Sequence, residues 1–369
     1  MTSVSLDVAR IVADRTILGP STVTIVDGVI ANIEHCFGAT RDVTLVPGFV
    51  DLQVNGIDDV DVATATGADW DRLDELLVAQ GTTTWLPTII SSPLATYGGR
   101  LREIRTAQQR TSVRPAMAGV HLEGPFLGSL AGAHPPSSII APDLDWVAAL
   151  PDVVRMMTIG AESPMTPDLI AALAAKGILV SLGHSAATAE QTCAAFANGA
   201  AMVTHGFNAM SGLHHRKPGM VGATLAHEGA AMSLIADLVH VSPDALKVAA
   251  TCLGYDRMVL VTDAVAWRSH NVGDVVFEFD GAAPRLADGT LAGSALTMDC
   301  AIRNMHHTVG IDLVAVIRAA TTTPARLMRC NDRGIIAAGR RADLVALDAD
   351  LRIVETWIGG TSVYQGPTS

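Results

Sequence analysis

Short apolar segments rich in Val, Ile, Leu and Thr recur through the middle of the chain, separated by alanine-rich stretches with helical spacing. Bounded apolar runs of this kind are typical of buried strands. They are apolar almost throughout, as expected for a parallel sheet whose two faces are both covered by helices. We identify eight such segments, at residues 48–54, 82–89, 116–123, 153–160, 178–184, 201–207, 231–237 and 257–263.

The stretches between these segments carry helix signals. In residues 68–81 the helical spacing ends at Gly81, a residue type that favours helix C-termini. In residues 166–177 we predict that Thr166 caps the helix and that Pro167 opens it. Strand and helix units repeated in this way predict an α/β fold of the TIM (β/α)8 barrel type.

The two ends of the chain show a different pattern. Residues 1–47 are typical of short strands with turns, including a hairpin signal at Asp27-Gly28, and residues 334–369 alternate in a similar way. We predict that both ends pair into one small β domain. The expected organisation is therefore a first part of the small β domain at 1–47, the barrel at 48–333, and the second part of the β domain at 334–369.

The charge balance limits the partners. The 369 residues include 25 basic and 37 acidic side chains, a formal net charge of −12, which repels nucleic-acid phosphates and anionic bilayers. We therefore expect neither nucleic acid nor membrane as a partner. Apolar residues make up 49% of the chain and charged residues 17%, a composition that supports a large core and excludes a disordered chain.

The cysteines and the amino terminus favour a cytoplasmic protein. The five cysteines are odd in number, far apart and free of C-x-x-C pairs, so the sequence suggests neither a disulfide framework nor a thiolate zinc site. Asp7, Arg10 and Asp14 interrupt the apolar run that a signal peptide requires.

Polar residues at the predicted strand ends are the candidates for chemistry, because the active site of a TIM barrel lies at the carboxyl ends of its strands. Glu123 ends the third predicted strand, His184 ends the fifth, and His205 lies in the sixth. One carboxylate and two imidazoles can converge on a single Zn²⁺-like cation and leave a position for water. The three residues predict a catalytic metal site.

A single histidine in a strand is more often a hydrogen-bonded structural residue than a metal ligand. Three candidate ligands and Asp263, each on a different predicted strand, are harder to explain as core residues, because a buried carboxylate is costly unless it is paired or coordinated. His121 lies two residues before Glu123, and we expect it to support the site rather than to bind the metal.

Asp263 ends the eighth predicted strand and is the natural general base. A bound Zn²⁺ lowers the pKa of its water towards about 7, and a nearby carboxylate can accept the proton during attack and return it to a leaving amine. His240 follows the seventh strand and could polarise the substrate carbonyl. The alternative interpretation of His240 is a surface-loop histidine.

A basic loop, His-His-Arg-Lys-Pro-Gly at 214–219, follows the sixth predicted strand. Such a run is usually a solvated loop. In an acidic chain, however, a basic cluster beside the predicted site suggests an anionic substrate, because Arg matches phosphate geometry bidentately.

Ten motifs occur along the chain in a specific order, and a further match lies in the carboxyl-terminal segment that begins at Gly334. In these motifs the sequence resembles the N-acetylglucosamine-6-phosphate deacetylases of the amidohydrolase superfamily over nearly its whole length. The motifs are PGFVDLQVNG at 47–56, TTTWLPTIISS at 82–92, GVHLEGPF at 119–126, LGHS at 182–185, THGFNAM at 204–210, RKPG at 216–219, IADLVHV at 235–241, LVTDA at 260–264, LAGSALTMDCAIRN at 291–304 and TTPARLM at 322–328.

The resemblance implies that Glu123, His184 and His205 bind the metal and that Asp263 is the acid and base, in agreement with the reasoning from the residues. Many amidohydrolases hold a second metal with a His-x-His pair at the end of strand one, where this chain has Gln53 and Asn55. Neutral amides are poor ligands for such a cation. We therefore expect one divalent ion per subunit, Zn²⁺ with Fe²⁺ or Mn²⁺ as alternatives, and interpret the two amides as a second-metal remnant.

The resemblance also implies the substrate contacts. His240 would contact the substrate carbonyl, Asn208 and the backbone of Ala209 would hold the sugar phosphate, and Arg216 would reach the phosphate across the interface of a homodimer. His134 lies where a substrate-contacting histidine can occur.

Two departures from the family pattern concern the sugar rather than the chemistry. Asp58 and Asp59 add carboxylates after Asn55, near a site that is expected to admit a phosphate ester. The His214-His215 pair in the basic loop is also untypical of the family.

The expected activity is the metal-dependent deacetylation of N-acetylglucosamine 6-phosphate to glucosamine 6-phosphate and acetate. One alternative is the same reaction on N-acetylgalactosamine 6-phosphate, and another is a catalytically idle sugar-phosphate sensor on the same scaffold. A cyclic amidase is disfavoured, because such enzymes want a strand-one His pair and a bridging lysine, and the strand-four segment VVRMMTIGAES has no lysine.

Overall fold

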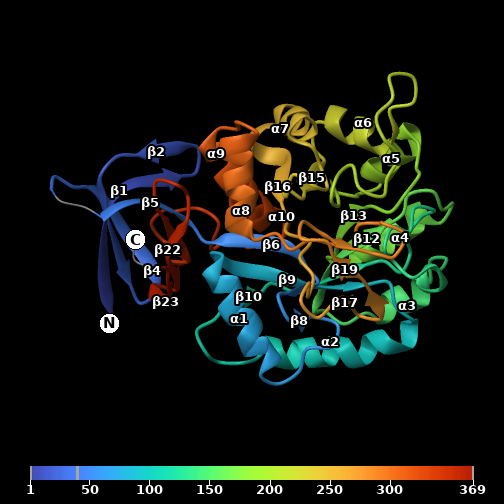
Figure 1. Ribbon diagram of the computed structural model, residues 1–369, viewed down its shortest axis with the longest axis horizontal. Coiled ribbons are helices and arrows are strands. Elements are labelled where there is room, and N and C mark those ends of the chain that lie inside the picture. Colours follow the sequence, from blue (N-terminus) through green and yellow to red (C-terminus); the bar gives the residue numbers. More distant parts are fainter. Residues whose placement is uncertain (1, 39–40, 368–369) are drawn as a thin grey trace.

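The computed structural model describes residues 2–38 and 41–367, so positions 1, 39–40 and 368–369 of the predicted β domain lie outside the described residues. Within the described chain, eight parallel strands form the predicted barrel (Figure 1). Each predicted apolar segment coincides with one of them, and only β9 extends beyond its segment, by one residue. They are β6 (Phe49–Val54), β9 (Thr82–Ile90), β11 (Val120–Glu123), β12 (Val154–Ile159), β13 (Leu179–Leu182), β14 (Met202–Val203), β15 (Ala231–Leu234) and β16 (Met258–Leu260).

The barrel is nearly closed. Its hydrogen-bonded order runs from β6 through β9 and β11 to β16, and a short strand, β10 (Ala116–Met117), also pairs with β9. A parallel bridge between Val54 and Ala264 joins the first strand to the segment that follows the last one. All residues of β6 and β9 are buried, as expected for a parallel sheet with both faces covered.

Helices surround the barrel, with α1 and α2 on one side of the view in Figure 1 and α5, α6 and α7 on the opposite side. Among the described residues, no helix combines the length and the apolar character needed to cross a membrane. The helices are α1 (Asp69–Ala79), α2 (Leu94–Gln108), α3 (Leu144–Ala149), α4 (Thr166–Ala175), α5 (Ala189–Ala197), α6 (Gly219–Ala226), α7 (Pro243–Arg257), α8 (Met298–Arg303), α9 (Leu313–Ala320) and α10 (Thr322–Leu327), with short turns of 3-10 helix at Pro136–Ser138 and π-helix at Asn304–Thr308.

One of the two predicted helix boundaries is correct and the other is wrong. Helix α1 ends just before Gly81, whose φ of 78° is the left-handed conformation that favours glycine. Thr166 does not cap α4, because Met165 is the residue before the helix and Thr166 lies within its first turn. The buried Thr166 hydroxyl instead faces the carbonyl of Gly160, at 3.5 Å.

Strands from both chain ends form a separate sheet, seen as blue and red ribbons beside the barrel in Figure 1. Asp27 and Gly28 have φ of 48° and 82°, the signature of the predicted tight hairpin. The domain boundaries at 47/48 and 333/334 remain a proposal. The strands are β1 (Ser3–Ala13), β2 (Thr16–Leu18), β3 (Ser21–Val26), β4 (Val29–His35), β5 (Arg41–Pro47), β21 (Leu344–Leu347), β22 (Ile353–Ile358) and β23 (Thr361–Gln365).

Small hairpins that the sequence pattern did not indicate lie in the loops after β6 and β16. Their strands have two residues each, too few to show a hydrophobic period. They are β7 (Gly56–Ile57) with β8 (Val60–Asp61), β17 (Asn271–Val272) with β18 (Val275–Val276), and β19 (Glu278–Phe279) with β20 (Pro284–Arg285).

We predict that Gly81→Ala destabilises the protein more than Gly177→Ala. Both glycines follow a helix and have positive φ, so both substitutions incur about 1–2 kcal/mol of backbone strain. A Cβ on Gly81 would also lie 2.6 Å from the Phe49 ring, whereas nothing lies within 4 Å of a Cβ on Gly177. Overpacking adds about 1–3 kcal/mol. Chemical denaturation measures the difference, and equal losses would contradict the packing argument.

Candidate metal centre and active site

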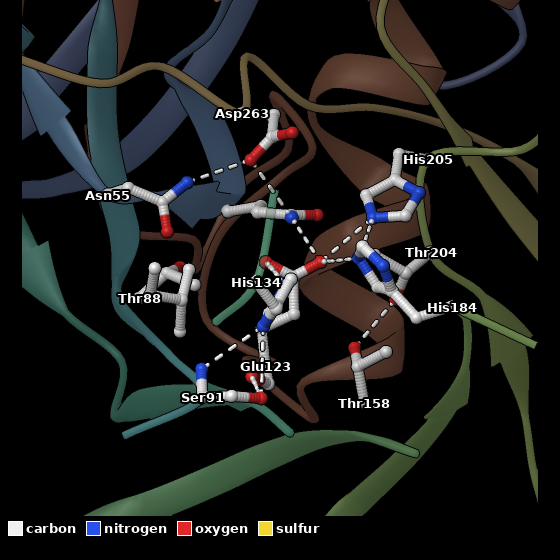
Figure 2. A network of polar contacts seen from close by, with 12 residues as sticks. Asn55, Thr88, Ser91, Glu123, His134, Thr158, His184, Thr204, His205 and Asp263 are labelled. Atoms are coloured by element: carbon white, nitrogen blue, oxygen red, sulfur yellow. Dashed lines mark hydrogen bonds and ion pairs between the residues drawn. The ribbon is translucent and has the colours of Figure 1, made fainter. Parts of the chain in front are cut away.

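The three predicted metal ligands meet at the carboxyl ends of the barrel strands, where Figure 2 shows their side chains pointing toward one another. Glu123 is the last residue of β11, and His184 and His205 follow β13 and β14 by two residues. The two histidines have φ of 47° and 33°, an uncommon conformation outside glycine that turns the chain sharply after each strand.

The distances among the three ligand atoms fit a single cation. Nε2 of His205 lies 2.8 Å from Oε1 of Glu123, and Nε2 of His184 lies 3.2 Å from the same oxygen. The two Nε2 atoms are 3.1 Å apart. Nitrogen ligands about 2.1 Å from a tetrahedral zinc ion would lie about 3.4 Å from one another, close to this spacing.

The protonation of His184 supports the same interpretation. Its Nδ1 lies 3.1 Å from the carbonyl oxygen of Leu130, and because a carbonyl can only accept, Nδ1 carries the hydrogen. In the neutral ring Nε2 therefore presents a lone pair to the Glu123 carboxylate. Two electron-rich atoms at this distance repel each other unless a cation lies between them. The residues present thus fit a divalent metal ion.

His134 is a further candidate, because its ligand atom lies within 4.8 Å of those of Glu123 and His184. Its Nδ1, however, accepts a hydrogen bond from the Ser91 backbone N–H at 3.2 Å. The pKa of His134 is lowered to about 4, chiefly by burial and secondly by the neighbouring His184. The ring is therefore neutral, and Nε2 carries its hydrogen. Nε2 faces the second oxygen of Glu123 at 3.7 Å. His134 is therefore placed to support Glu123 and to line the pocket.

The two amides at the end of strand one, Gln53 within β6 and Asn55 just after it, act as hydrogen-bond donors. Nε2 of Gln53 lies 3.0 Å from Oε1 of Glu123 and 3.0 Å from Oδ1 of Asp263, and Nδ2 of Asn55 lies 2.8 Å from the same Asp263 oxygen. Within the described chain, their buried amide oxygens have no hydrogen-bond partner. Gln53 thereby links the candidate metal centre to the candidate general base.

The two carboxylates have opposite pKa shifts. The pKa of Asp263 is raised, chiefly because the carboxyl group is buried and secondly because Glu123 is negatively charged. Burial also acts to raise the pKa of Glu123, but without a cation the ring nitrogens of His134, His184 and His205 that face it can hold a hydrogen and donate it to the carboxylate, which outweighs burial and lowers that pKa. In the absence of a cation, Glu123 is thus the ionised member and Asp263 the one that more readily holds a proton.

His240 belongs to a carboxylate–imidazole pair that the sequence analysis missed. Its Nδ1 lies 2.7 Å from Oδ2 of Asp237, and the backbone N–H groups of Val239 and His240 donate to Oδ1. A carboxylate accepts, so the Nδ1 hydrogen of His240 points to Asp237 and Nε2 takes no part in this pair. The D-x-x-H spacing after β15 was a signal that could have identified Asp237.

His121 is fully buried within the barrel beneath the candidate metal centre. Its Nδ1 lies 3.1 Å from the Leu52 carbonyl and its Nε2 lies 2.8 Å from the Thr158 hydroxyl, which in turn contacts the hydroxyl of Thr204 at 2.7 Å. Both ring nitrogens therefore have partners, and neither faces the metal centre.

A pocket of about 450 Å³ is lined by the three candidate metal ligands, Glu123, His184 and His205. Its wall also includes Asn208, Ala209, His240 and Asp263. The predicted His134 also lies in the wall, whereas sequence reasoning missed the loop residues 129–133, Val272 and 290–293 and the apolar Ile90, Ile235 and Val265. The proximity of these positions depends on the tertiary fold.

Arg216 lies outside this pocket. It is exposed, its guanidinium donates to Nε2 of His215 at 2.8 Å, and it borders a separate cavity of about 500 Å³ with Lys217 and residues 186–190. Within one chain, the structure therefore does not bring Arg216 together with the other predicted site residues.

The extra carboxylates after Asn55 do not enter the pocket wall. Asp58 pairs with Arg268 at 2.6 Å and with Arg72 at 3.3 Å, and Asp59 lies 3.6 Å from Arg72. These ion pairs neutralise charge that would otherwise repel an anionic substrate.

Comparisons with known proteins show which family and which enzymes the chain resembles. The chain matches the Amidohydrolase family over residues 44–363. It is 36% identical to N-acetylgalactosamine-6-phosphate deacetylase of Escherichia coli O157:H7, over 95% of this chain and 97% of that protein. It is 31% identical to N-acetylglucosamine-6-phosphate deacetylase of Bacillus subtilis, over 88% and 86%. The crystal structure of N-acetylglucosamine-6-phosphate deacetylase from Thermotoga maritima superimposes with a TM-score of 0.93 at 31% identity, over 98% of this chain and 100% of that one.

We predict that His205→Ala lowers the affinity for Zn²⁺ by more than about 100-fold, because losing a residue that merely supports a ligand typically reduces affinity 10–100-fold. Competition with a chromophoric chelator measures the affinity. His306→Ala is the control, since His306 is a half-buried histidine whose Nδ1 contacts the Ile311 carbonyl at 2.9 Å. Comparable affinity in both variants would exclude His205 from the metal centre.

Proposed function

The chain belongs to the amidohydrolase family, and on that premise we propose that it hydrolyses the acetamido group of N-acetylglucosamine 6-phosphate to give glucosamine 6-phosphate and acetate. The observation that carries this proposal is the convergence of Glu123, His184 and His205 beside Asp263. A structure from Mycobacterium smegmatis of the N-acetylglucosamine-6-phosphate deacetylase in complex with that sugar phosphate, with a TM-score of 0.89, supports the substrate class.

One divalent ion per subunit would be held by Glu123, His184 and His205. We propose Zn²⁺, with Fe²⁺ and Mn²⁺ as alternatives, because a Glu-His₂ set accepts all three. When bound, such an ion acts as a Lewis acid and favours deprotonation of water. Gln53 and Asn55, which donate through their amide nitrogens, are the remnant of a second-metal position.

Asp263 is the proposed general base and acid. Its carboxylate takes a proton from the attacking water as the new C–O bond forms at the acetyl carbon, and it returns that proton to the amine nitrogen as the C–N bond breaks. Gln53 and Asn55 donate to the same Asp263 oxygen, which holds the carboxylate in one orientation and leaves its other oxygen for the proton.

His240 is proposed to stabilise the negative charge that develops on the acetyl oxygen. Because Asp237 accepts the Nδ1 hydrogen, the ring is held in place, and its Nε2 would face the acetyl oxygen. In the doubly protonated ring, Nε2 donates a hydrogen bond to the oxyanion, and the Asp237 carboxylate balances the positive charge of that ring.

The sugar phosphate is proposed to bind at Asn208 and the backbone of Ala209, with His134 contacting the sugar. Arg216 would reach the phosphate from the second subunit of a homodimer, which agrees with its position outside the pocket of its own chain. The solution mass tests the dimer. A cytoplasmic location remains a prediction from the cysteine pattern, and cell fractionation tests it.

N-acetylgalactosamine 6-phosphate is the second candidate substrate. Deacetylases for this epimer in E. coli and in Shewanella are 36% and 34% identical to the chain, over 95% and 97% of its length. The two sugars differ in the orientation of one hydroxyl group, so the ratio of kcat/KM for the two epimers distinguishes them.

Acetate release over a panel of phosphorylated and unphosphorylated N-acetylhexosamines tests the function. We expect turnover on a 6-phosphate, loss of turnover with a chelator, and recovery on adding Zn²⁺. Asp263→Asn should retain the metal and lower kcat by about 10²–10⁴-fold, the usual contribution of general acid and base catalysis. A metal-loaded wild-type protein that releases no acetate from any of these sugars would instead favour the idle sensor.

We predict that Arg216→Ala raises KM for the phosphorylated sugar by about 10-fold or more, because a hydrogen bond to a charged group contributes about 1.5–3 kcal/mol. The KM for the unphosphorylated sugar should not change. Arg102→Ala, at an exposed position on α2, controls for the loss of a surface charge. Equal effects of Arg216→Ala on both sugars would count against a phosphate contact.

A further inference from the structure

Glu162 lies three residues after β12 and accepts hydrogen bonds from two neighbouring loops. Its Oε1 accepts from the backbone N–H and the hydroxyl of Ser129, at 3.1 and 3.2 Å, and from the backbone N–H of Ala186, at 2.6 Å. Its Oε2 accepts from the Ser185 hydroxyl at 2.5 Å. One carboxylate thus joins the segments that follow β11, β12 and β13.

The loop held by Glu162 also contacts a candidate metal ligand. Residues 129–134 line one side of the substrate pocket, and the Leu130 carbonyl accepts the hydrogen bond that orients the His184 ring. The backbone N–H of Gly128 donates to the His184 carbonyl at 2.9 Å. Ser129 lies between these two contacts, so its position affects both.

Packing around Glu162 is tight. A Cβ on Gly128 would overlap both carboxylate oxygens, and a Cβ on Gly160 would overlap the backbone of Gly128. Burial acts to raise the pKa of Glu162, but the hydrogen bonds from Ser185, Ser129 and Ala186 outweigh it and lower that pKa. The carboxylate is therefore ionised and its acceptor positions are used by the loops.

We propose that Glu162 is a positioning residue, whose carboxylate fixes loop 128–134 so that the Leu130 carbonyl orients His184 for the metal and the loop closes one side of the substrate pocket. This inference rests on the proposed function for the identity of the metal and the substrate. It assigns to Glu162 a role that acts through His184 and the loop, without contact with the reacting atoms.

Three substitutions separate this role from general destabilisation. Glu162→Ala removes every acceptor. Glu162→Gln keeps an amide oxygen for the two backbone N–H groups but loses the acceptor for the Ser185 hydroxyl, whose oxygen already accepts from the backbone N–H groups of Ala161 and Ala187. Glu162→Asp keeps the charge but is one methylene shorter. Glu228→Ala, at an exposed glutamate before β15, is the matched control.

The readouts are Zn²⁺ affinity by chelator competition and hydrogen exchange of the peptide that spans 126–134, both measured without substrate. We expect Glu162→Ala to lower the affinity by about 10–100-fold, the range for residues that support a ligand. Exchange should accelerate in this peptide and stay unchanged in 344–358 of the terminal sheet. Glu162→Gln should recover part of both properties, because it keeps the acceptor for the backbone N–H groups of Ser129 and Ala186, and Glu228→Ala should match the wild type.

The proposal would be overturned if Glu162→Ala kept the wild-type Zn²⁺ affinity and the wild-type hydrogen exchange of the 126–134 peptide. It would also be overturned if the Ala and Gln variants were equally impaired and exchange accelerated throughout the barrel. If Glu162→Ala does not fold, the comparison of Asp with Gln decides, since the shorter side chain should bind Zn²⁺ more weakly than Gln. A wild-type protein that binds Zn²⁺ yet releases no acetate would overturn the proposed function and leave these readouts interpretable.

Discussion

The site depends on one electrostatic constraint, which is the approach of the Glu123 carboxylate to two imidazole nitrogens in a buried environment. The Leu130 carbonyl fixes the hydrogen of His184 on Nδ1, so a lone pair faces the carboxylate at 3.2 Å. A cation turns this repulsion into attraction, and the low local dielectric makes both effects stronger than in water. Two neighbouring side chains contact this arrangement or the loop beside it. Gln53 connects it to Asp263, and Glu162 holds the loop that presents the Leu130 carbonyl.

Most of the barrel could be predicted from the sequence, because strands buried on both faces show as apolar segments in the chain itself. The grouping of Glu123, His184 and His205 could be predicted for a related reason, since parallel strands bring their carboxyl ends to one edge of the barrel. The residue that precedes α4 could not be predicted, and the expected cap at Thr166 is wrong, because the path of the preceding loop decides which residue begins the helix. The hairpins after β16 also lacked a signal, having strands of two residues.

Contacts between loops were the part of the site that sequence reasoning did not reach. Glu162 is 33 residues from Ser129 and 23 from Ser185, and nothing in the local pattern of the segments indicates that they meet. The Asp237–His240 pair differs, because its partners are three residues apart and a local search could detect it. Arg216 is a third case, since its proposed role depends on a second subunit that one chain does not contain.

The backbone at the site indicates how metal binding and stability are coupled. His184, His205 and Asp263 have φ of 47°, 33° and 49°, in the left-handed region where each non-glycine residue costs about 1–2 kcal/mol. Hydrogen bonds hold these turns, including one from the His205 N–H to the Ser233 hydroxyl at 2.8 Å and one from the Asp263 N–H to the Gln53 carbonyl at 3.0 Å. A metal ion that binds the assembled ligands and not the unfolded chain adds about 2.7 kcal/mol at 100 times its Kd. That gain is comparable to the strain at two of these three residues, so metal binding requires the turned strand ends and offsets part of their energetic cost.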